Sequence, residues 1–259
     1  TGGVAIGLEK LLDPDTKVGM WTQSLDLGGG MSGTGYNGVG FQMNGWLVGS
    51  DQRIGRNGVA GFAFGQSSGQ QRLDQSVDHT RSRSTDGMLY AGWRNGNWYT
   101  QGSVGFGHFQ QNVNRELLLG TRWQGVWTDY SGRYSMACGE SGLHFSNGVA
   151  KLSPFVDVQY ARINRDAFAE QGAGGFGLRA DAQTLDRWQA GLGVRAAHHW
   201  QFSDTRSLDL TAHAEWQHTL SAHGDAFDAS FVGLQQWQPL GGIGLSRDTG
   251  LFGVGVDTA

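Results

Sequence analysis

Residues 208–217 read LDLTAHAEWQ, ten positions at which apolar and polar side chains alternate. The apolar positions are Leu208, Leu210, Ala212, Ala214 and Trp216. The polar positions are Asp209, Thr211, His213, Glu215 and Gln217. A period of two is that of a β-strand, whose successive side chains point to opposite faces. A tilted strand needs about 9–11 residues to cross a bilayer, so this stretch predicts a membrane-spanning strand.

The same period recurs in ten segments along the chain. In one of them Val156 and Val158 alternate with Asp157 and Gln159. The segments lie near 18–27, 37–49, 58–68, 84–93, 98–110, 129–145, 150–164, 184–199, 207–219 and 241–258. Short connections at 50–57, 94–97, 146–149 and 200–206 alternate with longer ones at 28–36, 69–83, 111–128, 165–183 and 220–240. This pattern predicts an all-β antiparallel meander and is typical of transmembrane β-barrels, which have short turns at one end and long loops at the other.

A soluble sandwich or a lipocalin-like barrel also alternates, but two observations favour a membrane barrel. Sandwich strands average about 5–6 residues, and the segments here are longer. Aromatic residues also recur near strand ends, where an interfacial girdle needs them: Trp21, Trp46, Trp93, Trp98, Tyr160, Trp188, Trp200 and Trp216. We therefore expect the apolar faces to meet lipid and the polar faces to line a lumen. The expected lumen-lining residues are Gln42, Asn44, Gln101, Asp157, Gln159, Arg195, Asp209, His213 and Glu215.

Composition excludes several other classes of protein. Glycine supplies 44 of 259 residues without a collagen period, and the aromatic fraction of 11% is too high for a disordered chain. A lone Cys138 builds neither a disulfide framework nor a thiolate metal site. The net charge of −4 and the absence of basic runs do not predict a basic surface for binding nucleic acid. No stretch is apolar enough for a transmembrane helix, and we expect neither a cofactor nor a metal.

The amino end has a different period. Residues Thr1–Leu8 lack the basic start and the cleavage site of a secretory signal. In residues 3–12 (GVAIGLEKLL) leucines recur at helical spacing, and Pro14 follows as a stop. So short a helix is marginal in water, so we expect it to be enclosed by the barrel, with a frayed tail or a short extra strand as the alternative. Its expected pore residues are Val4, Leu8, Glu9, Lys10, Leu11 and Leu12.

Catalytic motifs are weak throughout the chain. Residues 28–33 (GGGMSG) fit G-x-G-x-x-G, but no helix pattern follows and we interpret them as a loop. Leu143 replaces the last glycine of a G-x-S-x-G elbow in residues 139–143. His198 and His199 are adjacent, so on a strand they point to opposite faces and cannot chelate one metal. His218, His223, Asp225 and Asp228 cluster in a long connection and are interpreted as solvated. We single out no catalytic residue.

With these residues in view, the chain resembles the translocator domain of type V autotransporters. The features are the short helix leading into VGMWTQSLDLGGG (18–30), then YNGVGFQMNGWLVGSDQRIGRNGVAGFAFGQSSG (36–69), KLSPFVDVQYARI (151–163), DRWQAGLGVRAAHHW (186–200) and DLTAHAEWQHTL (209–220). The resemblance implies a twelve-stranded barrel in the outer membrane of a Gram-negative bacterium. It implies export and anchoring of an N-terminal passenger, with help from the barrel-assembly machinery and no enzymatic activity in the barrel itself. Residues 1–14 would then be a linker helix in the pore, and residues 15–259 the barrel.

Two departures from the family pattern matter. The sequence predicts ten strands and not twelve, and the last residues, Gly253–Ala259, lack the family's terminal aromatic. We therefore expect either a barrel truncated at its C-terminus or closure at ten strands, which is physically allowed. The strands look most like barrels that follow a serine protease or esterase passenger. The alternatives are a ten-stranded outer-membrane hydrolase of the omptin or phospholipase kind, and a simple porin.

Overall fold

The computed structural model describes residue 12 and residues 18–33, 36–73, 78–203, 206–224, 226–234, 236–241 and 246–258. Ten long strands form one sheet in which each strand is antiparallel to its neighbours. In sheet order they are β1 (Met20–Gly33), β2 (Tyr36–Ile54), β3 (Gly58–Leu73), β4 (His79–Asn95), β5 (Trp98–Leu119), β6 (Arg122–Leu143), β8 (Ala150–Arg165), β11 (Gln183–Ser203), β12 (Arg206–His223) and β15 (Asp248–Thr258). The two-residue strand β7 (Phe145–Ser146) pairs with β8. The predicted all-β antiparallel meander of about ten strands is confirmed.

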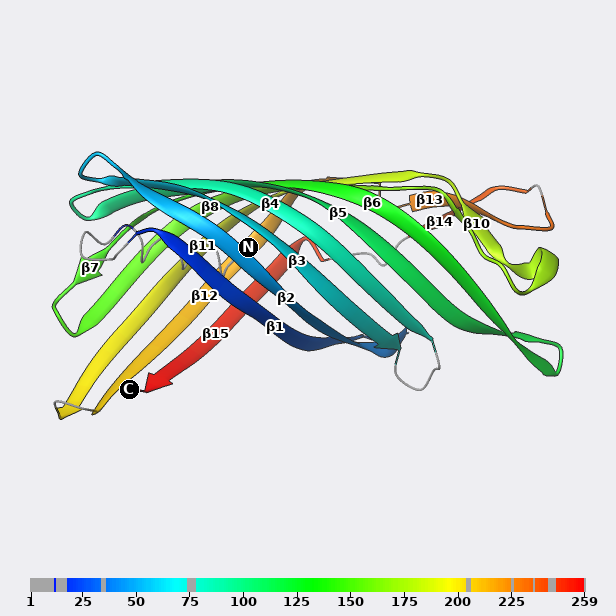
Figure 1. Ribbon diagram of the computed structural model, residues 1–259, viewed down its shortest axis with the longest axis horizontal. Helices are drawn as coiled ribbons and strands as arrows, with labels where there is room; N and C mark the ends of the chain where they lie inside the picture. Colours follow the sequence, from blue (N-terminus) through cyan, green and yellow to red (C-terminus); the bar gives the residue numbers. More distant parts are fainter. Residues whose placement is uncertain are drawn as a thin grey trace.

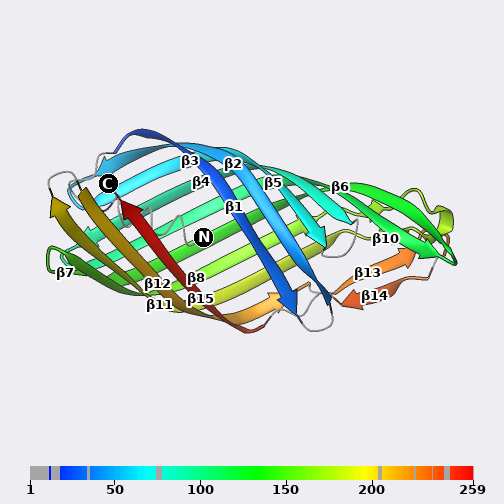
Figure 2. The same ribbon diagram turned by 90° about the horizontal axis from the view of Figure 1, so that it is seen from below.

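The sheet curls strongly about its long axis, as Figure 1 and Figure 2 show. Its two edge strands, β1 and β15, lie on the same side of the molecule in both views. Within the described residues these two strands do not pair with each other, so the sheet is a curled half-barrel whose order runs from β1 to β15 without closing. No helix in the described part of the chain is long and apolar enough to cross a membrane.

The two ends of the sheet differ. At one end the strands are joined by tight turns, such as the Gly96–Asn97 turn between β4 and β5. Gly96 has a φ of 60°, a left-handed conformation that glycine adopts without a steric penalty. At the other end two long connections form a second, four-stranded sheet of β9 (Phe168–Ala169), β10 (Leu178–Ala180), β13 (Ala226–Phe231) and β14 (Gln238–Gly241), with a short 3-10 helix η1 (Gly174–Phe176). This second sheet lies beside the far end of β6 (Figure 1).

Three of the predicted long connections are wrong. Most of 28–36, 69–83 and 111–128 is strand, because β1 to β6 continue well beyond the predicted ends. The GGGMSG stretch therefore belongs to β1 and is not a loop. Strands β5 and β6 reach 22 residues each, more than twice what a bilayer requires. The sequence of the β5 extension does not alternate: Gln111 and Asn112 are both polar, and residues 117–119 are all leucine, so the period-two signal is lost there.

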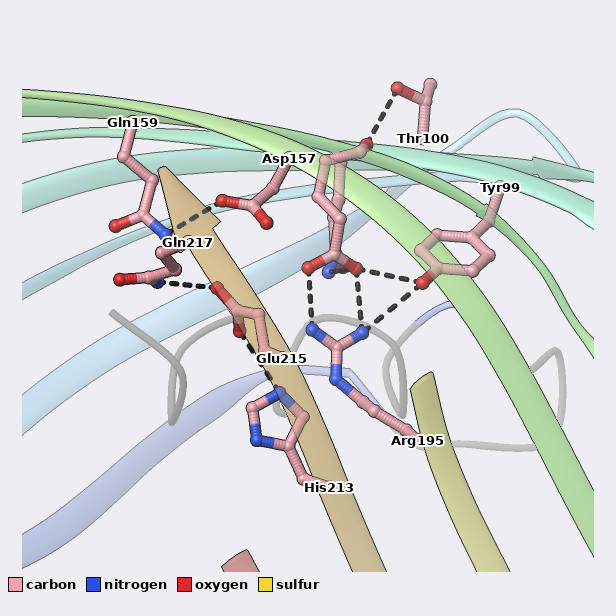
Figure 3. Close-up of polar contacts among 10 residues, drawn as sticks. Tyr99, Thr100, Asp157, Gln159, Arg195, His213, Glu215 and Gln217 are labelled. Carbon is pink, nitrogen blue, oxygen red and sulfur yellow. Dashed lines mark hydrogen bonds and ion pairs between the residues drawn. The ribbon is translucent and has the colours of Figure 1, made fainter. Parts of the chain in front are cut away.

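The register assigns every strand residue to one of two faces, because directly paired residues on neighbouring strands point the same way. Gln101 pairs with Glu140, and Glu140 with Asp157. These three side chains are buried and share one face of the sheet. Figure 3 shows Asp157 on the concave side, so we call this face the inner face. The opposite, convex face we call the outer face. It carries exposed apolar side chains such as Val104, at 49% exposure, and Leu192, at 57%.

The apolar sets predicted on β5, β8 and β11 to face away from the lumen lie on the outer face. Val104 and Phe106 on β5, Val156 and Val158 on β8, and Leu192 on β11 are all exposed there. Aromatic residues of the outer face pair near the strand ends, such as Trp93 with Trp98 at 5.5 Å between ring centroids. Trp21 is an exception to the expected girdle, since it pairs with Gly49 on the inner face and donates a hydrogen bond to Tyr90.

Two of the expected lumen residues are on the other face. Gln42 and Asn44 are exposed on the outer face, in the same alternation as Trp46, whereas Phe41 and Met43 turn inward. The expectation failed because it took the polar side of every strand as the inner side. The exposed apolar side chains of the outer face form a band across the strands, which we call the apolar band. On the part of β2 that lies beyond this band, the outer face is itself polar.

A small apolar core lies within the concavity. Leu12, Val59, Tyr99 and Phe155 are all buried and pack together, with Val18 against them. A Cβ atom at Gly92 would lie 3.1 Å from the Leu12 side chain, so the absence of a side chain there makes room for the leucine. The other predicted pore-helix residues, Val4, Leu8, Glu9, Lys10 and Leu11, lie outside the described residues, as does most of the predicted helix.

Candidate functional site

A buried ion pair forms the centre of the inner face. Arg195 of β11 makes two parallel hydrogen bonds to Glu140 of β6, with Nη1 to Oε1 at 2.7 Å and Nη2 to Oε2 at 2.6 Å. The Tyr99 hydroxyl donates to Oε1 of Glu140 at 2.8 Å, and Gln101 Nε2 donates to the same atom at 2.9 Å. Such a bidentate, charge-assisted pair is geometrically specific. It joins strands that lie two positions apart in the sheet (Figure 3).

Aromatic contacts extend this network toward β12. The guanidinium carbon of Arg195 lies 3.9 Å from the centre of the Phe155 ring, a cation–π contact. The other partner of Phe155 is His213, whose ring is nearly parallel at 5.9 Å. Nε2 of His213 in turn lies 3.1 Å from Oε2 of Glu215. Residues from β5, β6, β8, β11 and β12 therefore contact one another across the concavity (Figure 3).

Asp157 adds a third carboxylate to this region. Its Oδ1 accepts a hydrogen bond from Gln159 at 2.8 Å, while its Oδ2 is buried and has no hydrogen-bond partner among the described residues. A Cβ atom at Gly191 would overlap this carboxylate, so glycine is required where β11 passes Asp157. Glu140, Asp157 and Glu215 face one guanidinium, that of Arg195, so the inner face is acidic here.

The structure brings together six of the nine expected lumen residues and separates the others. Gln101, Asp157, Gln159, Arg195, His213 and Glu215 surround the centre of the inner face. Asp209 is on the same face but nearer the turn end, where it contacts His199 at 2.8 Å. Gln42 and Asn44 are on the outer face. His198 stacks on Trp200 at 4.0 Å, so His198 and His199 do point to opposite faces as expected.

Sequence reasoning missed Glu140, Tyr99 and Phe155, the main partners of Arg195. Glu140 was considered only within an incomplete nucleophile elbow. Its position did carry a signal, because it alternates with Ala137, Gly139 and the small residues around them. Tyr99 and Phe155 are aromatic residues on the inner face, where alternation alone predicts polar ones.

The predicted His and Asp cluster does not assemble. His218 pairs with Asp248 at 2.8 Å, and His223 lies 3.7 Å from Asp186. Asp228 is on β13, and Asp225 lies outside the described residues. Within the described ranges, no three His, Cys, Asp or Glu side chains are grouped so that they could hold a metal ion.

Beyond the apolar band, a second ion pair ties the long connections to the main sheet. Arg115, on the extension of β5, makes two hydrogen bonds of 2.5 Å to Glu170. Glu170 also accepts from the main-chain nitrogen of Leu178 on β10 at 2.7 Å. The hydrogen bonds to the Glu170 carboxylate raise the pKa of Arg115 above its ordinary value. The pair therefore stays charged and holds β10 beside the β5–β6 hairpin.

A further inner-face group predicts a measurable stability effect. The Tyr90 hydroxyl donates to the buried carboxylate of Asp51 and accepts from Trp21 Nε1 at 3.2 Å. We expect Tyr90→Phe to lower the free energy of unfolding by about 1–3 kcal/mol, because the buried carboxylate loses a donor. Urea unfolding in detergent, followed by tryptophan fluorescence, measures this difference.

The matched control is Tyr160→Phe. Tyr160 is on the outer face, where its ring packs on Trp188 at 4.7 Å between centroids. A change within about 0.5 kcal/mol is expected there. Equal losses in the two variants would contradict a special role for the Tyr90 hydroxyl.

Comparison with known proteins decides the family. Residues 20–259 match the family model described as "Autotransporter beta-domain". The chain belongs to the autotransporter beta-domain family. This places it among the β-barrel translocators of the Gram-negative outer membrane, in agreement with an outer face of exposed apolar side chains and a polar inner face.

A solved translocator structure shares the fold of this autotransporter domain, and two curated proteins are similar to it in sequence. The translocator domain of autotransporter NalP from Neisseria meningitidis superposes with a TM-score of 0.68 at 16% identity, over 99% of this chain and 93% of that one, which shows the fold. The extracellular serine protease of Serratia marcescens is 27% identical over 248 residues, 93% of this chain and 23% of its own length. Esterase EstA of Pseudomonas aeruginosa is 25% identical over 202 residues, 76% of this chain and 30% of its own length. The chain thus spans less than a third of either curated relative.

Proposed function

We propose that this chain exports an N-terminal passenger domain and anchors it at the cell surface. In this proposal residues 15–259 form the barrel, and residues 1–14 lie within it as a linker to the passenger. The observation that carries the proposal is the family match over residues 20–259, joined to the burial of Leu12 within the concavity. Surrounding outer-membrane lipid and the barrel-assembly machinery are the other proposed partners.

Two features of the inner face support a place for residues 1–14 there. Leu12 already contacts the side chains of Val59, Tyr99 and Phe155 at the centre of the inner face. Lys10 precedes Leu12 by two residues, and the buried Oδ2 atom of Asp157 has no donor among the described residues. An ammonium group beside Asp157 and Glu215 would offset the excess of carboxylates, since a buried charge is costly unless it is paired.

We propose that any catalytic activity belongs to the passenger and not to the barrel. Inner-face carboxylates are bound to Arg195, Gln159 and His213, in contacts that hold side chains in place. A nucleophile activated by an adjacent base is one arrangement that hydrolases use, and we place none in the barrel. Serine protease or esterase activity, as named for two relatives, is proposed for a passenger only.

The test is an export assay in cells. An epitope-tagged passenger is fused in frame before Thr1 of the full protein, and protease is added to intact cells. We expect the tag to be removed while the barrel remains folded in the outer membrane. A tag that stays protected beside a folded barrel would contradict export, and hydrolysis by the barrel alone would favour the hydrolase alternative.

The place of residues 1–14 is tested separately by single-channel conductance of the full-length protein. Deleting these residues is expected to raise the conductance, because the segment occupies the lumen. An unchanged conductance would favour an open porin. The substitution Leu89→Ala, at an exposed outer-face leucine, is the control and should leave the conductance as it is.

A further inference from the structure

Along strands β3 and β5 the outer face changes from apolar to polar between one outer-face residue and the next. On β5 the exposed Phe106 is followed on the same face by His108, and on β3 Phe64 is followed by Gln66. Trp46, which packs on Phe64 at 6.3 Å between ring centroids, lies on this boundary. The boundary lies toward the end of the sheet that carries the long connections (Figure 1).

Cationic side chains gather immediately beyond the boundary. Arg81 and Arg83 on β4, His108 on β5 and Arg133 on β6 are all exposed on the outer face. Within the described part of the chain none of the four makes an ion pair or a side-chain hydrogen bond. His108 and Arg133 are directly paired in the register, an arrangement that is unfavourable when both are charged. An anion between them would remove that cost.

Among the residues that the structure describes, no carboxylate of the same face forms an ion pair with these four side chains. Asp129 accepts a hydrogen bond from Asn112 at 2.6 Å. Asp26, on β1, lies three strands away from Arg83. With respect to the described ranges, the three guanidinium groups are therefore available to an anionic ligand.

The surface is hollowed at Arg81, Arg83 and His108, while Arg133 is the register partner of His108 beside the grooves. Two adjoining grooves, of about 550 Å³ and about 940 Å³, share Asn44, Ser68, Arg83 and Gln110 in their walls. The smaller groove also includes Trp46 and His108, and the larger one Arg81. Hydroxyl and amide groups therefore lie between the guanidinium groups, beside the aromatic side chains of the apolar band. The larger groove also includes the Asp129 carboxylate, which accepts a hydrogen bond from Asn112.

We propose that these grooves bind the phosphate-bearing headgroup of a lipid in the surrounding leaflet. Guanidinium groups match phosphate oxygens with paired, charge-assisted hydrogen bonds. The hydroxyl and amide groups suit the sugar hydroxyls of a phosphorylated glycolipid. A lipid is favoured over a soluble anion because acyl chains attached to the bound headgroup would lie along Trp46, Phe64 and Phe106. The proposal is independent of the passenger and of its export.

The experiment titrates the purified full-length protein in detergent with bis-phosphorylated lipid A and with its dephosphorylated form, and counts bound lipid by native mass spectrometry. We expect the double variant Arg81→Gln/Arg83→Gln, which removes the two guanidinium groups that line the grooves, to bind the phosphorylated form at least about tenfold more weakly than the wild type, since hydrogen bonds to charged groups are worth that much. Binding of the dephosphorylated form should be unchanged.

Two matched controls make the same charge change elsewhere. Arg56→Gln alters the β2–β3 turn at the opposite end, and Arg122→Gln alters the tip of the β5–β6 hairpin. Both should bind lipid A as the wild type does. Wild-type affinity in the double variant, or an equal loss in Arg56→Gln, would overturn the proposal. Displacement of lipid A by inorganic phosphate alone would also overturn it, because the site would then be one for a soluble anion.

A second measurement does not depend on counting lipids. Lipid A that binds the folded protein raises its melting temperature through mass action. We expect this rise for the wild type and for Arg122→Gln, and its loss in the double variant. All substituted side chains are exposed, so the variants should fold, and an unchanged melting temperature without lipid verifies this. An equal rise in all proteins would contradict the assignment of the grooves.

Discussion

Arg195→Met is expected to lower the free energy of unfolding by about 3–5 kcal/mol, the cost of removing one partner from a buried ion pair. The variant leaves Glu140 buried with its hydrogen bonds from Tyr99 and Gln101 but without a countercharge. It also removes the cation from the Phe155 ring. Urea unfolding of the full-length protein in detergent gives the free energy.

Two further variants separate charge from packing. Adding Glu140→Gln to Arg195→Met removes the unpaired carboxylate and should recover part of the loss, a coupling that a double-mutant cycle measures. Arg187→Met changes another arginine of β11, one whose side chain binds the Thr219 hydroxyl at 2.5 Å. That substitution should cost about 1 kcal/mol, the net value of an ordinary hydrogen bond. A loss at Arg187 as large as that at Arg195 would contradict a special role for the Glu140 pair.

Val104→Arg is expected to destabilise the protein in lipid by about 2–4 kcal/mol, the cost of a cation on the lipid face of a barrel near the bilayer midplane. Val104 is exposed on the outer face, among Phe62, Leu89 and Phe106. Reversible unfolding from lipid vesicles, with folded and unfolded fractions separated on a gel, measures the difference.

The neighbouring position supplies the control. Ser103 points to the inner face and lines a cavity of about 270 Å³ together with Gln101 and Glu140. Ser103→Arg introduces the same charge beside a carboxylate and should cost clearly less than Val104→Arg. Equal costs at the two positions would show that both faces meet the same medium, and would overturn the assignment of the outer face to lipid.

Much of the fold follows from a period of two. The segments around Val104, Val156 and Leu192 keep apolar side chains on one face and polar or small ones on the other, and each became a strand of the predicted sheet. Where neighbouring residues are alike the period vanishes, as at Gln111 and Asn112 or at residues 117–119 (LLL), so the continuation of β5 and β6 through 111–128 could not be predicted. Gln42 and Asn44 were reversed for another reason: β2 still alternates there, but its polar side is the outer one.

The inner network could be predicted only in part. Alternation identified Asp157, Arg195 and Glu215 as members of one face, but their partners depend on which strands are neighbours and on the register between them. Glu140 is 55 residues from Arg195 in the chain, and Tyr99 is 96 residues from it. Glycine was informative after the fact, since Gly191 is required where Asp157 fills its space.

The strict division of each strand between two faces has a consequence for how this sequence changes over time. Val156 and Asp157 are adjacent along the backbone, yet their side chains face different environments. A substitution at the first position changes contact with the outer medium, and one at the second changes the inner network. Substitutions at alternate codons should therefore have separable effects, so the outer positions can change while the inner contacts are kept.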